Sequence, residues 1–170
     1  MLGFYNYTVI LTYLSLCSAV TGIFVGVSGT GHPFIATTCL MVCGFLDAFD
    51  GIVARSKKDR TEQEKKFGIQ IDSLCDVVCF GIFPAMICYC LGVNTPAGVA
   101  ALIFYSIASV IRLAYFNVTE AKRQTQTEEN RKYYQGLPIT SMAIILPFLY
   151  LMRRYYMIHF LIVIHIAVII

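Results

Sequence analysis

The sequence predicts an all-α integral membrane protein whose six transmembrane helices form one bundle. Of its 170 residues, 58% are hydrophobic and only 14% are charged, and the mean hydropathy is +0.70. The apolar residues lie in runs of about 20, the length that an α-helix needs to cross a bilayer. A net charge of +3 gives no reason to expect a nucleic-acid partner. We therefore expect one transmembrane domain over residues 1–170, embedded in the lipid bilayer of the cell membrane.

Turn-forming or charged residues bound each of the six apolar segments. The predicted spans are residues 8–28, 34–55, 67–91, 97–117, 138–152 and 157–170. The first run continues as a span, so we do not expect a cleavable signal peptide. The Ser-Gly-Thr-Gly-His-Pro run at 28–33 and the segment Gly92–Pro96 are typical of turns. Pro84 is expected to kink the third span, because proline removes a backbone hydrogen bond.

Basic residues gather in two loops, Ser56–Lys66 and Val118–Gln135. These loops follow the second and fourth spans, so they lie on the same side of the membrane. The positive-inside rule places that side, and with it both chain ends, in the cytoplasm. Arg153 and Arg154 fall on the opposite side in this count, and we expect them to reach lipid headgroups at the interface.

All cysteines of the chain lie within the predicted spans. They are Cys17, Cys39, Cys43, Cys75, Cys79, Cys88 and Cys90. Since no histidine lies near enough in the sequence to complete a zinc site, we expect them to pack as small hydrophobic side chains.

Four aspartates interrupt the second and third spans. They are Asp47, Asp50, Asp72 and Asp76. A charged aspartate at the centre of a membrane helix costs about 2.5–3.5 kcal/mol on insertion scales. The first two differ in direction by about 60° on a helix and the last two by about 40°, so each pair shares one face. The connecting loop returns the chain antiparallel, which predicts that both pairs lie near the cytoplasmic boundary.

Facing carboxylates repel one another unless cations lie between them. Oxygen ligands without histidine or cysteine select hard ions such as Mg²⁺, Mn²⁺ or Ca²⁺. Gly51 leaves room for a bulky group on the same helix, and Arg55 could meet a phosphate. Together these features predict a site for a lipid-linked pyrophosphate, where two metals neutralise the diphosphate and a free carboxylate deprotonates an incoming hydroxyl. The simpler alternative is that the aspartates pair with Arg55, Arg112 and nearby lysines.

The aspartates belong to a longer pattern of eight residues with fixed spacing. It reads Asp47-x2-Asp50-Gly51-x2-Ala54-Arg55, followed by Gly68-x3-Asp72-x3-Asp76. This pattern resembles the signature of the CDP-alcohol phosphotransferase family. The gap between Arg55 and Gly68 is longer than that family usually shows.

Further segments are similar to the phosphatidylserine synthase branch of the family. They are Asp72-Ser73-Leu74-Cys75-Asp76 with Phe80-Gly81 and Pro84-Ala85, then Arg112-Leu113-Ala114-Tyr115-Phe116-Asn117, and Gly136-Leu137-Pro138. Tyr115 stands where this branch usually has a second arginine. The segment Thr12-Tyr13-Leu14-Ser15 only loosely matches a first-span pattern, and the resemblance covers about residues 8–150.

The resemblance implies a six-helix membrane enzyme with the CDP-alcohol phosphotransferase fold, usually a homodimer, with a site that faces the cytoplasm. Such an enzyme transfers the phosphatidyl group of CDP-diacylglycerol to L-serine, giving phosphatidylserine and CMP. The resemblance also implies roles for individual residues. Two divalent ions (Mg²⁺ or Mn²⁺) are held by Asp47, Asp50, Asp72 and Asp76, and Asp76 also acts as the base. The CDP group is bound by Gly51, Ala54, Arg55 and Gly68.

Arg112 is the best candidate to bind the serine carboxylate, because it lies near the cytoplasmic end of the fourth span. Its alternative is an arginine that snorkels to the interface. Glycerol 3-phosphate or inositol remain alternative acceptors, although phosphate-bearing acceptors call for more basic residues. A divalent-cation or proton transporter is an alternative of another class, and it predicts acids at the bilayer midplane on several helices.

Overall fold

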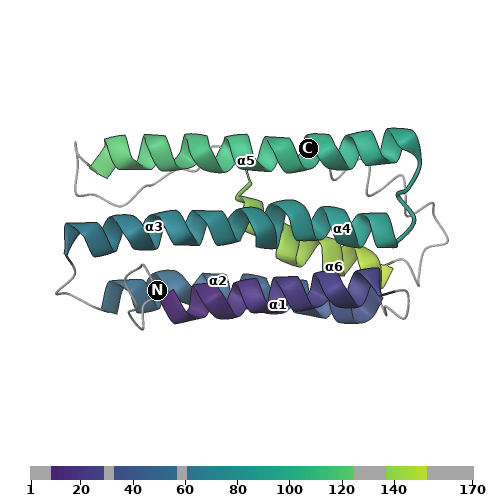
Figure 1. Cartoon of the computed structure of the whole chain (residues 1–170), viewed down its shortest axis with the longest axis horizontal. Helices are drawn as coiled ribbons and strands as arrows, with labels where there is room; N and C mark the ends of the chain where they lie inside the picture. The colour runs from purple at the N-terminus through teal and green to yellow at the C-terminus, as the bar shows by residue number, and fades with distance from the viewer. Residues whose placement is uncertain (1–8, 29–32, 57–60, 125–136, 153–170) are drawn as a thin grey trace.

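The computed structural model describes residues 9–28, 33–56, 61–124 and 137–152, and within them it contains helices and turns but no strand. The elements are α1 (Ile10–Val27), α2 (Pro33–Ser56), α3 (Glu62–Asp76), the π-helix η2 (Val77–Ile82), α4 (Phe83–Cys90), α5 (Pro96–Gln124), the 3₁₀ turn η3 (Ile139–Ser141) and α6 (Met142–Met152). The segments α3, η2 and α4 follow one another without a break and form one long rod (Figure 1).

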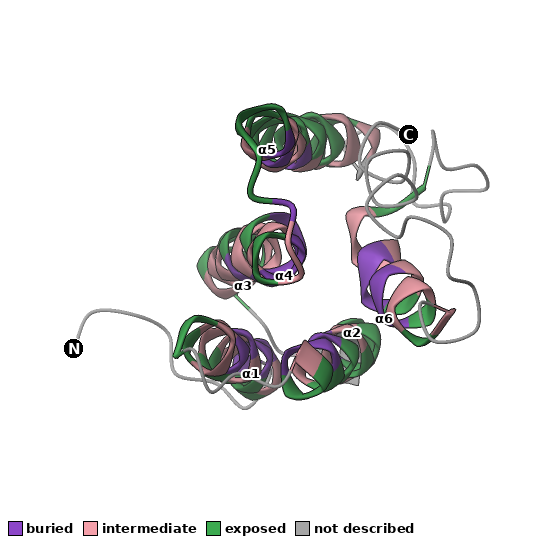
Figure 2. Cartoon of the chain, turned by 90° about the vertical axis from the view of Figure 1, so that its right-hand side faces the viewer, coloured by how far each residue is buried: buried purple, intermediate pink, exposed green. Residues whose placement is uncertain are grey.

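The long helices run side by side along the long axis of the molecule (Figure 1). The rod of α3, η2 and α4 lies between α5 on one side and the α1–α2 pair on the other, and α6 packs against α2 (Figure 2). The first helix packs mainly against α2. The rod is therefore the central element of the bundle, and it contacts every other long helix.

Four helices are long and apolar enough to cross a membrane, namely Ile10–Val27, Pro33–Val53, Glu62–Cys90 and Pro96–Arg123. They correspond to the first four predicted spans, so the prediction of a multi-pass helical membrane protein is confirmed. The predicted span 138–152 is a shorter apolar helix, Ile139–Met152. The predicted span 157–170 and the Arg153-Arg154 pair lie outside the described residues, and the count of six spans stays a prediction.

The third helix begins earlier than the sequence predicted, at Glu62 instead of residue 67. A capping box explains this start. The Glu64 backbone N–H donates to the Thr61 hydroxyl over 3.2 Å, and the Thr61 backbone N–H donates to the Glu64 carboxylate over 3.0 Å. The first turns of α3 are polar, so hydropathy alone did not mark them as helix.

The fifth helix continues to Gln124, so residues 118–124, which the sequence assigned to a loop, are helical. An ion pair stabilises this last part, because Arg123 lies 2.6 Å from Glu120 one turn earlier. The hydropathy pattern marks where a helix leaves the membrane, and α5 extends beyond that point.

Pro84 is accommodated by a π-helical segment that directly precedes α4. In this segment the Phe83 N–H donates to the carbonyl of Val78, five residues earlier. Because proline has no N–H, a carbonyl one turn earlier loses its helical donor. The Tyr105 hydroxyl donates to the Phe80 carbonyl over 2.5 Å, so α5 supplies the missing hydrogen bond. The expected irregularity at Pro84 therefore takes the form of a shift in hydrogen-bond register.

Glycines allow close contacts between helices at several crossings. An ideal Cβ on Gly81 would lie 2.5 Å from the Ser109 hydroxyl of α5, and one on Gly44 would overlap the Cβ of Ala143 in α6. Small residues at such crossings are typical of membrane helices, whose backbones approach closely.

The core lies where the rod meets α1, α2 and α6, and its largest fully buried side chains include Phe80, Phe83, Leu40 and Leu146. Cys43, Cys75, Cys79 and Cys88 are buried free thiols, as expected for cysteines that pack as small hydrophobic residues, whereas Cys17 and Cys90 are exposed.

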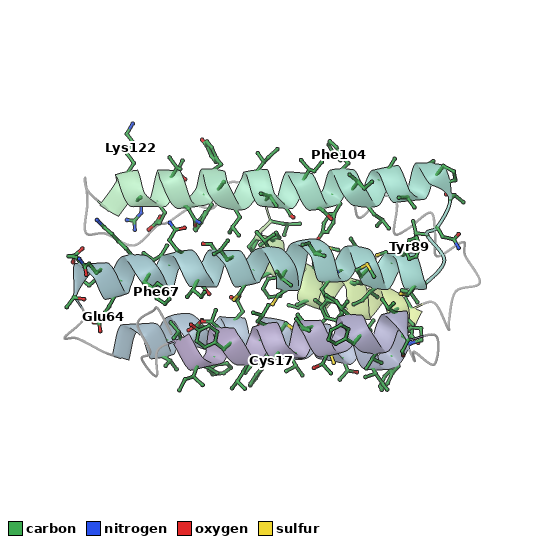
Figure 3. The ribbon with its side chains drawn as sticks, in the orientation of Figure 1. Cys17, Glu64, Phe67, Tyr89, Phe104 and Lys122 are labelled. Carbon is green, nitrogen blue, oxygen red and sulfur yellow. The ribbon has the colours of Figure 1, made fainter. Side chains whose placement is uncertain are left out.

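The outer surface of the bundle is apolar along its middle. Large hydrophobic side chains such as Leu14, Phe45, Phe104 and Ile144 are exposed, and Figure 3 shows Phe104 pointing away from the bundle. Charged side chains mark one end instead, where Glu64 and Lys122 lie opposite Tyr89 (Figure 3). An apolar belt with a charged end fits a bilayer on the sides and water at that end.

We predict that Tyr105→Phe destabilises the protein, because it leaves the Phe80 carbonyl without its donor inside the bundle. The expected loss is about 1–3 kcal/mol of unfolding free energy. Thermal unfolding in detergent, followed with a thiol-reactive fluorophore that reports exposure of the buried cysteines, measures it. Tyr115→Phe is the matched control, since Tyr115 is 62% exposed on the same helix. Equal unfolding temperatures for the two variants would contradict this account of Pro84.

Candidate metal centre

The four aspartates come from two neighbouring antiparallel helices, as the sequence predicted. Asp47 and Asp50 lie in the second half of α2, and Asp72 and Asp76 lie at the end of α3. Carboxylate oxygens of Asp47, Asp72 and Asp76 all lie within 4.8 Å of one another. The three side chains are partly buried, so the cluster lies between the helices and not on their outer surface.

The aspartates meet in two pairs across the helix interface. The side chains of Asp47 and Asp76 contact each other, and so do those of Asp50 and Asp72. This is the order expected for antiparallel helices, where the later residue of one faces the earlier residue of the other. Asp50 lies outside the group of three and is nearly fully buried, with 6% of its surface exposed.

Electrostatic repulsion makes this arrangement costly without a cation. Two unit charges separated by about 4.8 Å repel by about 3 kcal/mol at an effective dielectric constant near 20. Oxygens bound to one Mg²⁺ at about 2.1 Å lie no more than about 4.2 Å apart, so the cluster needs only a small closure to bind such an ion. The all-oxygen donor set and this spacing both fit a hard divalent cation.

The other residues of the eight-residue pattern lie near the aspartates along the chain. Gly51 is exposed on α2 directly after Asp50, and Gly68 is partly buried one turn before Asp72. Ala54 and Arg55 lie near the C-terminal end of α2, and their side chains are outside the described part of the structure.

Arg112 lies on α5, where its side chain is exposed. Two contacts set the register of this helix against the rod: Ser109 faces Gly81, and the Asn117 amide donates to the Ser73 hydroxyl over 2.7 Å. This antiparallel register places Arg112 level with residue 78, about 3 Å along the axis from the level of Asp76.

Two hydrogen bonds at the site involve residues to which sequence reasoning gave no role. Asn117 binds Ser73, which lies between Asp72 and Asp76 in the chain. Thr12 of α1 donates its hydroxyl to Asp50. Both donors lie in segments that resembled family patterns, so the motifs marked the segments but not the contacts.

The centre lies toward the charged end of the bundle. The helix Glu62–Cys90 has 29 residues and is therefore about 43 Å long, more than the 30 Å of a bilayer core. Asp72 lies about 15 Å and Asp76 about 21 Å from its start, beyond a stretch that contains Glu64, Lys65 and Lys66. The four aspartates lie on two helices, whereas the transporter alternative predicts acids on several helices.

Comparison with known proteins places residues 5–170 in the profile of the CDP-alcohol phosphatidyltransferase family. A relative from Saccharomyces cerevisiae is 36% identical over 110 residues, which cover 64% of this chain and 38% of the relative. A relative from Mycobacterium leprae is 33% identical over 135 residues, which cover 79% of this chain and 43% of the relative. A relative from Helicobacter pylori strain 26695 is 35% identical over 135 residues, which cover 78% of this chain and 52% of the relative.

All three relatives are named CDP-diacylglycerol–serine O-phosphatidyltransferase. The chain spans about half or less of their length. No solved structure matches the chain. Since the family profile covers nearly all of its residues, and relatives above 30% identity agree with it, the chain belongs to the CDP-alcohol phosphatidyltransferase family.

Proposed function

We propose that the protein transfers the phosphatidyl group of CDP-diacylglycerol to the hydroxyl of L-serine, giving phosphatidylserine and CMP. The cluster of Asp47, Asp72 and Asp76 carries this proposal, because three signature aspartates bring carboxylate oxygens within 4.8 Å of one another. The names of the relatives support serine as the acceptor.

In this proposal the four aspartates hold two divalent ions, Mg²⁺ or Mn²⁺. Such ions, when bound, neutralise the diphosphate of the donor and the charge that develops on the departing CMP. The spacing in the cluster and the absence of nitrogen and sulfur ligands among the four side chains support hard ions. Gly51, Ala54, Arg55 and Gly68 bind the CDP end of the donor.

The reaction is a substitution at the phosphorus that carries the diacylglycerol. The serine hydroxyl oxygen forms a bond to this phosphorus, and the bond to the bridging oxygen of CMP breaks, so that CMP leaves with the electron pair. The hydroxyl proton passes to the carboxylate of Asp76, the aspartate of α3 that directly precedes the π-helix. A carboxylate within hydrogen-bonding distance of the hydroxyl can act as such a general base.

Arg112 binds the carboxylate of serine in this proposal. The register of α5 supports it, because Arg112 lies level with residues near Asp76 and five residues before Asn117, which contacts the rod. A guanidinium group is well suited to a carboxylate because it can donate two parallel hydrogen bonds.

We further propose that the complete bundle has six spans in the cell membrane, functions as a homodimer, and presents its site to the cytoplasm. The basic residues near the ends of α3 and α5, among them Lys65, Lys66, Lys122 and Arg123, support this orientation. The bilayer then provides the lipid donor, and the cytoplasm provides serine.

An acceptor assay tests the proposed function. Detergent-solubilised protein given CDP-diacylglycerol, labelled L-serine and Mn²⁺ or Mg²⁺ is expected to form labelled phosphatidylserine, and Asp76→Asn is expected to abolish turnover. Parallel reactions with glycerol 3-phosphate and inositol distinguish the acceptors. Product from one of these and none from serine would show a wrong acceptor, and metal-ion transport without any lipid product would overturn the transferase itself.

The metal centre predicts opposite effects of Asp72→Asn with and without divalent ions. In EDTA the variant is expected to unfold at a higher temperature than the wild type, because one carboxylate charge is removed from the cluster. Added Mn²⁺ is expected to stabilise the wild type by about 2.7 kcal/mol at 100 times its dissociation constant, and the variant by less. Glu62→Gln, which changes an exposed acid of the same helix, is the control. An equal Mn²⁺ response in Asp72→Asn and the wild type would argue against this centre.

Arg112→Ala is predicted to raise the KM for serine by about tenfold or more, because a charge-assisted hydrogen bond contributes about 1.5–3 kcal/mol. The KM for CDP-diacylglycerol is expected to change little. Steady-state kinetics with each substrate varied in turn measures both constants. The control is Arg123→Ala, which removes an arginine that pairs with Glu120 farther along α5. If both KM values rise together, Arg112 does not bind serine.

A further inference from the structure

The first helix contributes a side chain to the metal centre. The Thr12 hydroxyl of α1 donates a hydrogen bond to Oδ2 of Asp50, which lies 38 positions later in the chain. Both residues are almost completely buried, with 4% of Thr12 and 6% of Asp50 exposed. A buried carboxylate oxygen needs a hydrogen-bond donor or a cation, because water cannot reach it.

Thr12 uses its hydroxyl differently from other threonines in these helices. Thr21, Thr37 and Thr119 each donate to a carbonyl of their own helix. That is the ordinary choice for a helical threonine, since such a carbonyl lies three or four residues away. Thr12 donates instead to an aspartate of another helix, and that aspartate faces the cluster.

Two further hydroxyls on the same face of α1 fix the position of Thr12. Ser15 donates to the Cys43 carbonyl of α2 over 3.4 Å, and Ser18 donates to the Cys39 carbonyl over 3.1 Å. The three hydroxyls are spaced three residues apart, so they line one side of the helix. They hold α1 against α2 in the register that brings Thr12 to Asp50.

We propose that Thr12 is a positioning residue of the metal centre, which orients Asp50 by holding one of its carboxylate oxygens and leaves the other oxygen for a divalent cation. This inference rests on the proposed function, since it concerns the same aspartates. Asp50 contacts Asp72 but lies outside the group of three closest carboxylates. Its orientation therefore decides whether it can join the ligand set.

Binding of Mn²⁺ in the absence of substrates tests the proposal directly. The purified protein in detergent is titrated with Mn²⁺, and free Mn²⁺ is measured by electron paramagnetic resonance. Thr12→Val keeps the size of the side chain and removes the hydroxyl, and we expect it to weaken Mn²⁺ binding about tenfold, the lower end of the effect of losing an outer partner of a metal ligand. Thr12→Ser keeps the hydroxyl and is expected to bind Mn²⁺ like the wild type.

Two variants separate this role from packing. Thr37→Val makes the same change at a threonine that is 3% exposed and donates within α2, and we expect unchanged Mn²⁺ binding. Ser15→Ala removes one contact between α1 and α2, but the Ser18 contact and the bond from the Cys43 thiol to the Ser15 carbonyl remain. It is therefore expected to lower the unfolding temperature and to weaken Mn²⁺ binding much less than Thr12→Val does. If Thr12→Val does not survive purification, Thr12→Ala removes the same hydroxyl and gives the same comparison.

The outcomes distinguish this proposal from the proposed function. Wild-type affinity in the variants that lack the Thr12 hydroxyl would overturn the role of Thr12 and leave the metal centre intact. Equal losses in Ser15→Ala and Thr12→Val would also overturn it, because helix packing alone would then explain both. A wild-type chain that binds no Mn²⁺ would overturn the metal centre and with it the proposed function.

Discussion

Repulsion among the aspartates of α2 and α3 is the constraint on which the rest of the structure depends. The helices around them are apolar, and Asp50 is nearly fully buried while the other three are partly buried, so their charges are screened less than those of carboxylates on an open surface. The same low dielectric that makes the cluster unfavourable when empty strengthens its attraction for a divalent cation. Stability and ligand binding are therefore coupled at this point, since a cation that binds the folded protein also offsets the repulsion among these carboxylates.

The bundle holds these acids in place through polar contacts between helices that are otherwise apolar. On one side, α1 is fixed to α2 by Ser15 and Ser18 and reaches Asp50 through Thr12. On the other side, α5 is fixed to the rod by Tyr105 and Asn117. Inside a membrane such hydrogen bonds and close packing replace the hydrophobic effect as the source of helix association. The rod that carries Asp72 and Asp76 is thus supported on both faces.

The sequence predicted those features that follow from helix periodicity. The spacings of three and four residues placed each aspartate pair on one face, and a short charged loop required an antiparallel return. The helix ends at Glu62 and Gln124 were missed because polar turns outside the membrane leave no hydropathy signal. The partner of Asp50 could not be found either, because the register between α1 and α2 depends on packing that no local pattern records. Pro84 indicated an irregular helix, but the π-helix and its donor from α5 arise from tertiary contacts.

The length of the central rod has a consequence for the two faces of the membrane. A helix of 29 residues exceeds the hydrocarbon thickness, so with its polar first turns in water the aspartates lie in the half of the helix that is nearer to one membrane surface. Under the proposed function, a lipid donor diffuses to the site within that leaflet and a polar acceptor arrives from the adjacent solution. Neither substrate has to cross the hydrocarbon core. The new lipid therefore forms in a single leaflet, and its appearance in the other leaflet depends on a separate translocation step.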